Sequence, residues 1–327
     1  MTMAEPVPDR ETLWTALALA VHAPSVHNTQ PWRWRFGQRS VHLYADPQRW
    51  LPATDPAGRD MVMSCGAALH HARIALAALG WAGTVHRLPN PADPDHLAAI
   101  ELHREEPSRE VLALATAIPH RRSDRRRYAS WPVPDARYLE YAELAAAEGV
   151  VLRAVPDGAE RQALVAAVAE ADRLQRSDPR TVGELASWSG RGRLAEDGVL
   201  AASVAEAAGY GDLTLRTFAG TPDTPPPPDG AGDLLVLGTA SDDRTAQLKA
   251  GEAASAVMLA ATTDGLASCP LTQPLEVGST RAMVTDVLGG DLVPHMVIRI
   301  GWPTLAGHPL PKTPRRPADA VLDTEPA

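Results

Sequence analysis

The sequence predicts an α+β protein in which antiparallel or mixed sheets are flanked by helices and the chain is built from two similar halves. Two observations support this prediction. Short stretches with period-two alternation stand beside long Ala-rich stretches with helical periodicity. The order helix, strand, long helix, strand then occurs twice along the 327 residues. We therefore expect an internal duplication, although no residue-level repeat is visible.

The first half is expected to span residues 1–107. An amphipathic helix is predicted over residues 10–22, where apolar residues recur at helical spacing. The segment WRWRF (32–36) alternates aromatic and basic residues, which predicts a strand with one buried face, and VHLYA (41–45) forms the returning strand. A long helix over residues 59–80 and strands at 84–88 and 98–103 follow.

The second half is expected to span residues 108–327. It starts with a helix from Ser108 to just before Pro119, and the later elements repeat the earlier order. They are a helix at 134–148, a strand at 149–155, a helix at 158–175, a long helix at 245–265 and a strand at 294–302.

Residues 177–230 stand apart from this order. They begin with a short helix for which Asp178 is a candidate cap and Pro179 lies in the first turn. A Pro/Gly-rich stretch follows at 219–232. An insertion of this length is either a lid-like cover for an active site or a surface excursion, and the sequence leaves both open.

Composition narrows the classes of protein. The formal charge of −9 argues against a nucleic-acid binder that relies on phosphate attraction. The N-terminus lacks a basic region followed by an apolar run, and no apolar stretch approaches the roughly 20 residues of a membrane span. Cys65 and Cys269 are expected to be buried free thiols. We expect a cytoplasmic protein with a small-molecule partner.

Two segments carry polar groups at positions typical of binding loops. In HAPSVHNTQPW (22–32), Ser25, Asn28 and Gln30 could read the edge of a flat heteroaromatic ring, or they could satisfy the backbone of a turn. In TTDGLASCPL (262–271), Gly265 and Leu266 could let the backbone approach a ligand, or Gly265 could end the long helix.

Two further segments carry arginine. PHRRSDRRRY (119–128) holds five arginines in an acidic chain. Arginine makes bidentate bonds to phosphate, so a phosphomonoester is the natural small partner, and a solvated basic loop is the alternative. A nucleic-acid module is disfavoured because no aromatic residues are interleaved. The tail PKTPRRPADAVL (311–322) adds Lys312, Arg315 and Arg316 as further cationic groups, or it is the end of a disordered tail.

Taken together, these segments resemble the FMN-dependent nitroreductase family. APSVHNTQPW resembles its A-P-S-x-x-N-x-Q-P-W signature, and RRSDR resembles its R-[RH]-S-x-[RK] signature. GLASCPL stands where the family has a Gly-Leu turn after its long central helix, and PRRP resembles its C-terminal basic segment. Ordinary members carry the arginine element first, whereas here it comes second. This reversed order resembles the fused, Acg-type actinobacterial branch.

The resemblance implies one FMN held between the two halves, with a second site lost. Ordinary members are homodimers with FMN at the interface, so a fused chain could act as a monomer. The resemblance implies that Arg125, Arg315 or Arg316 holds the phosphate and that Arg121 or Arg122 faces the pyrimidine edge. It also implies that Gly265 and Leu266 present backbone near the flavin N5. The full set of expected cofactor-binding residues is Pro24, Ser25, Asn28, Gln30, Arg121, Arg122, Ser123, Arg125, Gly265, Leu266, Arg315 and Arg316.

The reaction implied by the resemblance is hydride transfer from NADH or NADPH to FMN and then to a nitroaromatic or quinone-like acceptor. No catalytic side chain is nominated, because the flavin carries the chemistry. The alternative is an FMN-sequestering protein with a covered flavin and little reductase activity. In that case residues 177–230 would form the cover, with Trp188 and Leu194 as candidate plugs over the ring.

Overall fold

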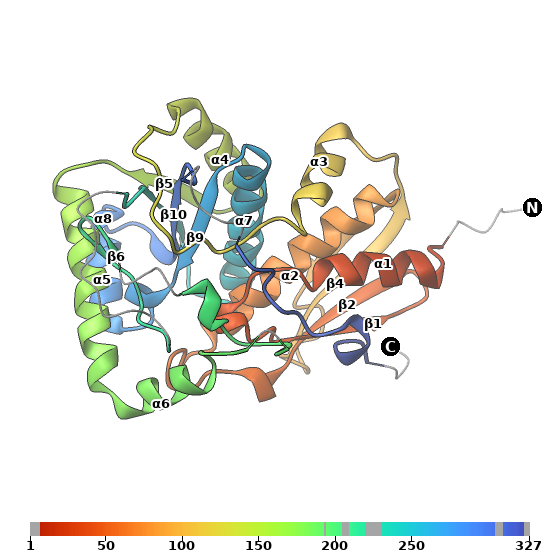
Figure 1. The fold of residues 1–327 in the computed structure, drawn as a ribbon. Helices are drawn as coiled ribbons and strands as arrows, with labels where there is room; N and C mark the ends of the chain where they lie inside the picture. Colours follow the sequence, from red (N-terminus) through yellow and green to blue (C-terminus); the bar gives the residue numbers. More distant parts are fainter. Residues whose placement is uncertain (1–6, 193, 205–208, 220–229, 305–309, 324–327) are drawn as a thin grey trace, which may run out of the picture.

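Two four-stranded antiparallel sheets form the framework of the computed structural model, which describes residues 7–192, 194–204, 209–219, 230–304 and 310–323 (Figure 1). The strands of the first sheet are β1 (Trp32–Phe36), β2 (Ser40–Ala45), β3 (Trp81–Arg87) and β4 (His96–Arg104), in the order β1-β2-β4-β3. Those of the second are β5 (Val151–Val155), β8 (Asp233–Thr239), β9 (Ala267–Leu271) and β10 (Val293–Gly301), in the order β5-β8-β10-β9. The α+β prediction is confirmed, and both sheets are antiparallel throughout.

Helices cover these sheets and connect them. They are α1 (Arg10–Ala20), α2 (Arg59–Ala78), α3 (Arg109–Ala117), α4 (Asp135–Ala147), α5 (Ala159–Ser177), α6 (Pro179–Ser187), α7 (Arg244–Thr263) and α8 (Gly278–Val287). Short 3-10 turns lie at Val26–Asn28, Pro47–Arg49, Ala201–Ser203, Gln273–Leu275 and Ala318–Ala320, and a small hairpin pairs β6 (Gly209–Tyr210) with β7 (Leu213–Thr214). No helix within the described ranges is both long and apolar enough to cross a bilayer.

The two sheets are pseudo-symmetric, because their strand orders correspond when β1, β2, β3 and β4 are matched with β5, β8, β9 and β10. The same match pairs α2 with α7, and both helices have 20 residues. These two helices pack against each other at the centre of the molecule (Figure 1). The expectation of two similar halves is therefore confirmed.

Glycines permit the close approach of α2 and α7. A Cβ at Gly66 would lie 2.1 Å from the carbonyl oxygen of Leu248, and a Cβ at Gly251 would lie 2.0 Å from that of Met63. Gly66 and Gly251 occupy the same position in their helices, so the two contacts are related by the pseudo-symmetry. No side chain larger than hydrogen fits at either contact without moving the backbones apart.

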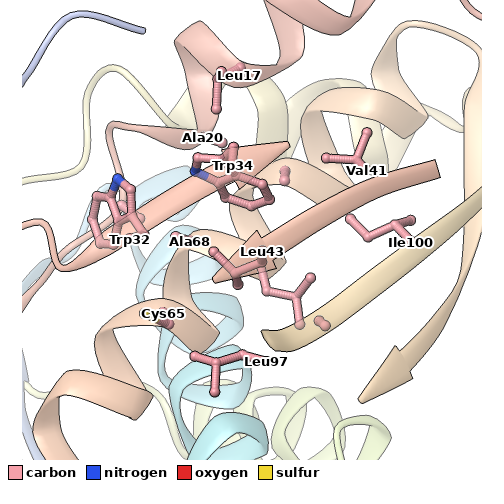
Figure 2. Close-up of a cluster of buried hydrophobic side chains, with 14 of the residues drawn as sticks. Leu17, Ala20, Trp32, Trp34, Val41, Leu43, Cys65, Ala68, Leu97 and Ile100 are labelled. Carbon is pink, nitrogen blue, oxygen red and sulfur yellow. The ribbon is translucent and has the colours of Figure 1, made fainter. Parts of the chain in front are cut away.

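The first core lies between the first sheet and helices α1 and α2. Trp32 and Trp34 on β1 are fully buried there and pack with Leu43, Leu97 and neighbouring apolar side chains (Figure 2). The alternation of WRWRF is thus explained, because its tryptophans face this core while its arginines do not.

Both faces of the second sheet are covered. Helices α4 and α7 pack on one face and α5 and α8 on the other. Strand β8 is therefore buried on both faces, and its run LLVLG lacks the period-two alternation that marks a half-buried strand. The C-terminal segment crosses back to the first half, where the Trp34 N–H donates to the carbonyl of Val321 at 2.7 Å (Figure 1).

Candidate functional site

Two adjoining cavities lie between the halves, and both are lined by Pro24, Ser25, Ser123 and Arg125. The first, which we call the inner cavity, encloses about 840 Å³ of space between atoms, and the second, the arginine cavity, about 510 Å³, open solvent included. The loop after α1 and the segment before α4 therefore meet where the sequence predicts one site.

The loop after α1 is held in an unusual backbone conformation. His27, Asn28 and Gln30 all have positive φ angles, of 45°, 56° and 52°. Such angles are uncommon outside glycine and persist only where surrounding contacts impose them. The hydroxyl of Ser25 accepts from the Gln30 N–H at 2.9 Å, and the hydroxyl of Ser64 on α2 accepts from the Val26 N–H at 3.1 Å.

Asn28 and Gln30 connect this loop to the insertion and the tail. Asn28 Nδ2 donates to the carbonyls of Gly198 at 3.2 Å and Pro314 at 3.1 Å, and its Oδ1 accepts from Arg315. Gln30 Nε2 donates to the carbonyl of Glu196 at 2.9 Å. Asn28 lines the arginine cavity, but Gln30 lines neither cavity, so its amide fixes neighbouring segments in place.

Four arginines line the arginine cavity, Arg121, Arg122, Arg125 and Arg315, and Arg125 also lines the inner cavity. The first two and Arg315 form a cluster of guanidinium groups. Arg315 donates to Asn28 Oδ1 at 3.0 Å and to the carbonyl of His22 at 3.0 Å. The Nε and Nη1 atoms of Arg121 and the Nε atoms of Arg122 and Arg315 are buried without a hydrogen-bond partner among the residues that the structure describes. No carboxylate in the same described ranges forms an ion pair with any of the three.

Burial lowers the pKa values of this cluster most, and the crowding of like charges lowers them further. Burial, together with Arg122, lowers the pKa of Arg121 to about 10. Burial, together with Arg121 and Arg122, lowers the pKa of Arg315 to about 9. Burial and the same arginines lower the pKa of His22 to about 4, so this histidine adds no charge at neutral pH. Buried cationic N–H groups without partners are a site for an anion with several oxygens.

Arg125 and Ser123 join the arginine cavity to the inner cavity. Their segment is attached to β9, because the Asp124 N–H donates to the carbonyl of Ser268 at 2.9 Å. The guanidinium of Arg125 lies over the ring of Phe218, 4.8 Å from its centroid. The structure therefore places Arg121, Arg122 and Arg315 at the arginine cavity and Arg125 where the two cavities adjoin.

The inner cavity is mostly apolar. Met63 and Ala67 of α2 face Ala254 and Met258 of α7 across it. The segment at the end of β9 forms a further wall, with residues Cys269, Pro270, Leu271, Thr272 and Gln273. A flat aromatic ring system suits such walls, since burial of its faces is favourable and the backbone at the cavity edge can bind its polar edge.

Gly265 and Leu266 line neither cavity. Gly265 has φ of 79° and ends α7, where its N–H donates to the carbonyl of Thr262 at 3.1 Å and the Leu266 N–H donates to that of Ala261 at 2.8 Å. This is the Schellman arrangement of a helix C-terminus. The backbone that borders the inner cavity lies further along the chain, in the segment 269–273.

Arg316 lines neither cavity and holds the tail against the first half. Its backbone N–H donates to Gln30 Oε1 at 2.8 Å, and its guanidinium lies 3.7 Å from Asp46. The tail segments that do line the arginine cavity are Leu310, Pro311, Thr313 and Arg315.

Described residues of the segment 177–230 line both cavities. Leu215, Arg216 and Phe218 line the inner cavity, and Gly198, Val199, Leu200 and Ser203 line the arginine cavity. Arg216 pairs with the buried carboxylate of Glu276 and donates to His27 Nε2, which fixes this segment to both halves. The prediction that Trp188 and Leu194 plug the space over the ring was wrong. Leu194 is 99% exposed, and Trp188 lies against Arg49 outside the cavities.

The pseudo-symmetric counterpart of the inner cavity is closed by charged side chains. The match of α2 with α7 places Glu252 at the position of Ala67 and Arg73 at that of Met258. Arg87, the last residue of β3, joins the same cluster. Glu252 is fully buried and accepts from Arg73 at 2.8 Å and from Arg87 at 2.7 Å. Arg73 also pairs with Glu148, which follows α4.

This ion-pair cluster has a direct consequence for the number of sites. At these positions small or apolar side chains border the inner cavity. The equivalent positions carry charged side chains, which occupy the space and need each other as ion-pair partners. Within the described residues, the positions equivalent to those that border the inner cavity therefore carry an ion-pair cluster instead.

Several cavity-lining residues carried no clear signal in the sequence. Asp60, His27 and Phe218 lie in segments whose sequence patterns do not distinguish a residue that lines a cavity from one that packs in a core. Only Asp60 offered a hint, as an acidic residue at the start of an otherwise apolar helix.

Comparison with known proteins gives the family. Residues 118–302 match the model of the nitroreductase family. The chain is 46% identical over 323 residues to a Mycobacterium tuberculosis protein provisionally named NAD(P)H nitroreductase Rv3131, covering 97% of this chain and 92% of that one. It is 37% identical over 317 residues to another from the same organism, provisionally named NAD(P)H nitroreductase acg, covering 95% of each. The chain therefore belongs to the nitroreductase family, and it is of the actinobacterial Acg type.

Similar solved structures include two enzymes named NfnB. One is an FMN and NADPH-dependent nitroreductase from Sphigopyxis sp. strain HMH, with 21% identity and a TM-score of 0.40, covering 65% of this chain and 98% of that one. The other is an FMN-dependent nitroreductase from Mycobacterium smegmatis in complex with NADPH, with 20% identity and a TM-score of 0.40, covering 62% and 94%.

Proposed function

We propose that this protein binds one FMN between its halves and is an NAD(P)H-dependent oxidoreductase of the nitroreductase type. The single observation that supports this most strongly is the junction of an apolar cavity with a cavity lined by arginines that keep buried N–H groups without a partner among the described residues. A flavin ring fits the first and a phosphate dianion fits the second. We also infer that the chain divides near residue 107, with residues 177–230 as a lid-like insertion in the second half.

Different residues would bind different parts of FMN. Arg121, Arg122 and Arg315 would bind the phosphate, since their free N–H groups surround that cavity. Ser25 and Ser123, which line both cavities, would lie along the ribityl chain that links the flavin ring to the phosphate. FMN would supply two-electron chemistry, with hydride from NADH or NADPH and a nitroaromatic or quinone-like compound as the final acceptor.

A second candidate function is FMN sequestration with little turnover. The observation that favours it is the cover formed by Leu215, Arg216 and Phe218, which narrows access to the inner cavity. The pair between Arg216 and Glu276 must break before this cover can open. The two functions share one binding site and differ only in whether a nicotinamide reaches the flavin.

The test starts with the absorption spectrum of protein reconstituted with FMN, which should be yellow with one flavin per chain. Anaerobic addition of NADH or NADPH should bleach it if the protein is a reductase. Bleaching by dithionite but not by either nicotinamide would support sequestration instead. Protein that stays colourless with added FMN would contradict both functions.

A further inference from the structure

Asp60 is a buried carboxyl group on the wall of the inner cavity. It lies in the first turn of α2, its side chain is 2% exposed, and it lines the cavity together with Met63 and Ser64. Neither of its carboxyl oxygens makes a hydrogen bond of normal geometry within the described ranges, and the nearby Thr272 hydroxyl donates to Glu276 Oε1 at 2.7 Å. An ionised carboxylate without partners would carry a large desolvation cost at this place.

The neighbouring acids are satisfied by other donors, but Asp60 is not. Asp55 accepts from the Met61 N–H at 2.9 Å. Glu276 accepts from the Thr272 hydroxyl at 2.7 Å and from Gln175 and Arg216. The cation Arg59 donates to Asp242 Oδ1 at 3.4 Å, to the carbonyl of Leu275 at 3.1 Å and to that of Pro294 at 3.4 Å.

Both geometry and charge therefore favour the neutral form of Asp60. Burial, followed by the charges of Asp55 and Glu276, raises the pKa of Asp60 well above its ordinary value, against the opposing effects of Arg59 and of the Thr272 hydroxyl. The other walls bring two cations, Arg125 and Arg216, and the latter is engaged with Glu276. A neutral carboxyl has an O–H to donate, whereas a carboxylate can only accept.

His27 adds a second donor on the same cavity. A guanidinium cannot accept, so Arg216 donates to His27 Nε2 and the proton of the neutral ring is on Nδ1. Burial lowers the pKa of His27 well below its ordinary value, which keeps the ring neutral. Its Nδ1 has no partner among the described residues. Two unused donors thus border a cavity whose other walls are mainly apolar.

We propose that Asp60 keeps its proton in the folded protein and donates a hydrogen bond to an acceptor atom, a carbonyl oxygen or a ring nitrogen, on the edge of the flat ring bound in the inner cavity. This inference rests on the proposed function where it takes that ring to be the flavin. Ionisation of Asp60 removes the donor and sets a negative charge against the acceptor, so ring affinity falls as the pH rises through the pKa of Asp60.

The experiment uses riboflavin and FMN as probes, with fluorescence quenching on the apoprotein from pH 5 to pH 9. Riboflavin lacks the phosphate, so its pH dependence excludes titration of that group. The variants are Asp60→Asn, which keeps a donor of similar size but cannot ionise, and Asp286→Asn on the exposed face of α8 as the matched control. Wild type and Asp286→Asn should bind riboflavin about tenfold more weakly once the pH has passed the pKa of Asp60, as loss of one hydrogen bond predicts, while Asp60→Asn should show no such loss.

An infrared measurement keeps the test decisive if Asp60→Asn does not fold. At pH 7.5, above the pKa of about 6 to which burial raises Asp55, the wild type should show a protonated carboxylic-acid carbonyl band that shifts on riboflavin binding. A missing band, a band that riboflavin leaves unshifted, or an equal pH dependence in Asp60→Asn overturns the role of Asp60 while the proposed function stands. If neither flavin binds at any pH, both fail.

Discussion

Arg121→Met should make the apoprotein more stable and FMN binding weaker, which is an uncommon pair of effects for one substitution. Arg121 is buried, has two unpartnered N–H groups and lies beside Arg122. The fall of its pKa from 12.5 to about 10 corresponds to about 3 kcal/mol against the charged form in the folded apoprotein. Replacement by Met removes this cost but also loses some of the packing made by the arginine's aliphatic stem. We therefore expect the free energy of unfolding to rise by about 1–3 kcal/mol.

The same substitution removes a charge-assisted hydrogen bond to the phosphate. Such bonds contribute about 1.5–3 kcal/mol each, so the Kd for FMN should rise roughly ten- to hundredfold. Riboflavin lacks the phosphate, and its Kd should stay the same. Urea unfolding of the apoprotein and calorimetric titration with each flavin measure the two effects separately. Arg109→Met on the exposed surface of α3 is the matched control, for which neither quantity should change.

Two results would refute this reasoning. A lower free energy of unfolding for apo Arg121→Met would mean that the buried guanidinium is satisfied rather than strained. An equal loss of affinity for riboflavin and FMN would mean that Arg121 supports the fold of the site and does not bind phosphate.

Further predictions concern packing, the closed counterpart and pH. Gly66→Ala should lower the free energy of unfolding in urea by about 3 kcal/mol or more, because its Cβ meets the Leu248 carbonyl, whereas Gly183→Ala in α6, with nothing within 4 Å, should raise it by about 0.5–1 kcal/mol. Glu252→Gln should cost about 3–5 kcal/mol by the same measurement and leave the Kd for FMN unchanged. Unfolding of the apoprotein should become less favourable as the pH rises from about 4 to about 6.5. Histidines whose pKa the fold lowers take up protons on unfolding in this window, so their contribution to stability rises with pH. The carboxyls whose pKa the fold raises release protons on unfolding, so their contribution falls with pH, but they are fewer: Asp55, Asp60 and Glu252. These histidines are His22, His27, His42, His70, His71, His96 and His295. A flat or falling stability curve over this range would contradict the assignment of neutral, buried histidines.

Periodicity predicted those elements that have one face in a core and one in solvent. The strand at Trp32–Phe36 and the helices at Arg10–Ala20 and Arg59–Ala78 follow their patterns closely. Strand β8 was not predicted, since burial on both faces removes alternation, and β9 was missed because Pro270 breaks the strand pattern.

Local motifs predicted which segments meet but not which atoms border the cavities. The segments around Asn28, Ser123 and Arg315 do converge on one place. Which arginine N–H groups are left without a partner depends on how deeply each arginine is buried. That burial is set by the tail and the insertion, whose sequences have no periodic pattern. Gly265 shows the limit most clearly. A helix end and a ligand-binding turn both need glycine, so the residue type alone cannot separate them.

The pseudo-symmetry explains how a duplicated fold can come to hold a single site. The glycines that bring α2 and α7 together are the same in both halves, because the backbone contact tolerates nothing larger. The positions that border the cavity are under no such restriction, and there Ala67 and Met258 are matched by Glu252 and Arg73. One pair leaves space for a ligand, while the other fills that space with mutual ion pairs. The backbone thus permits two sites, and side chains at a few equivalent positions select one.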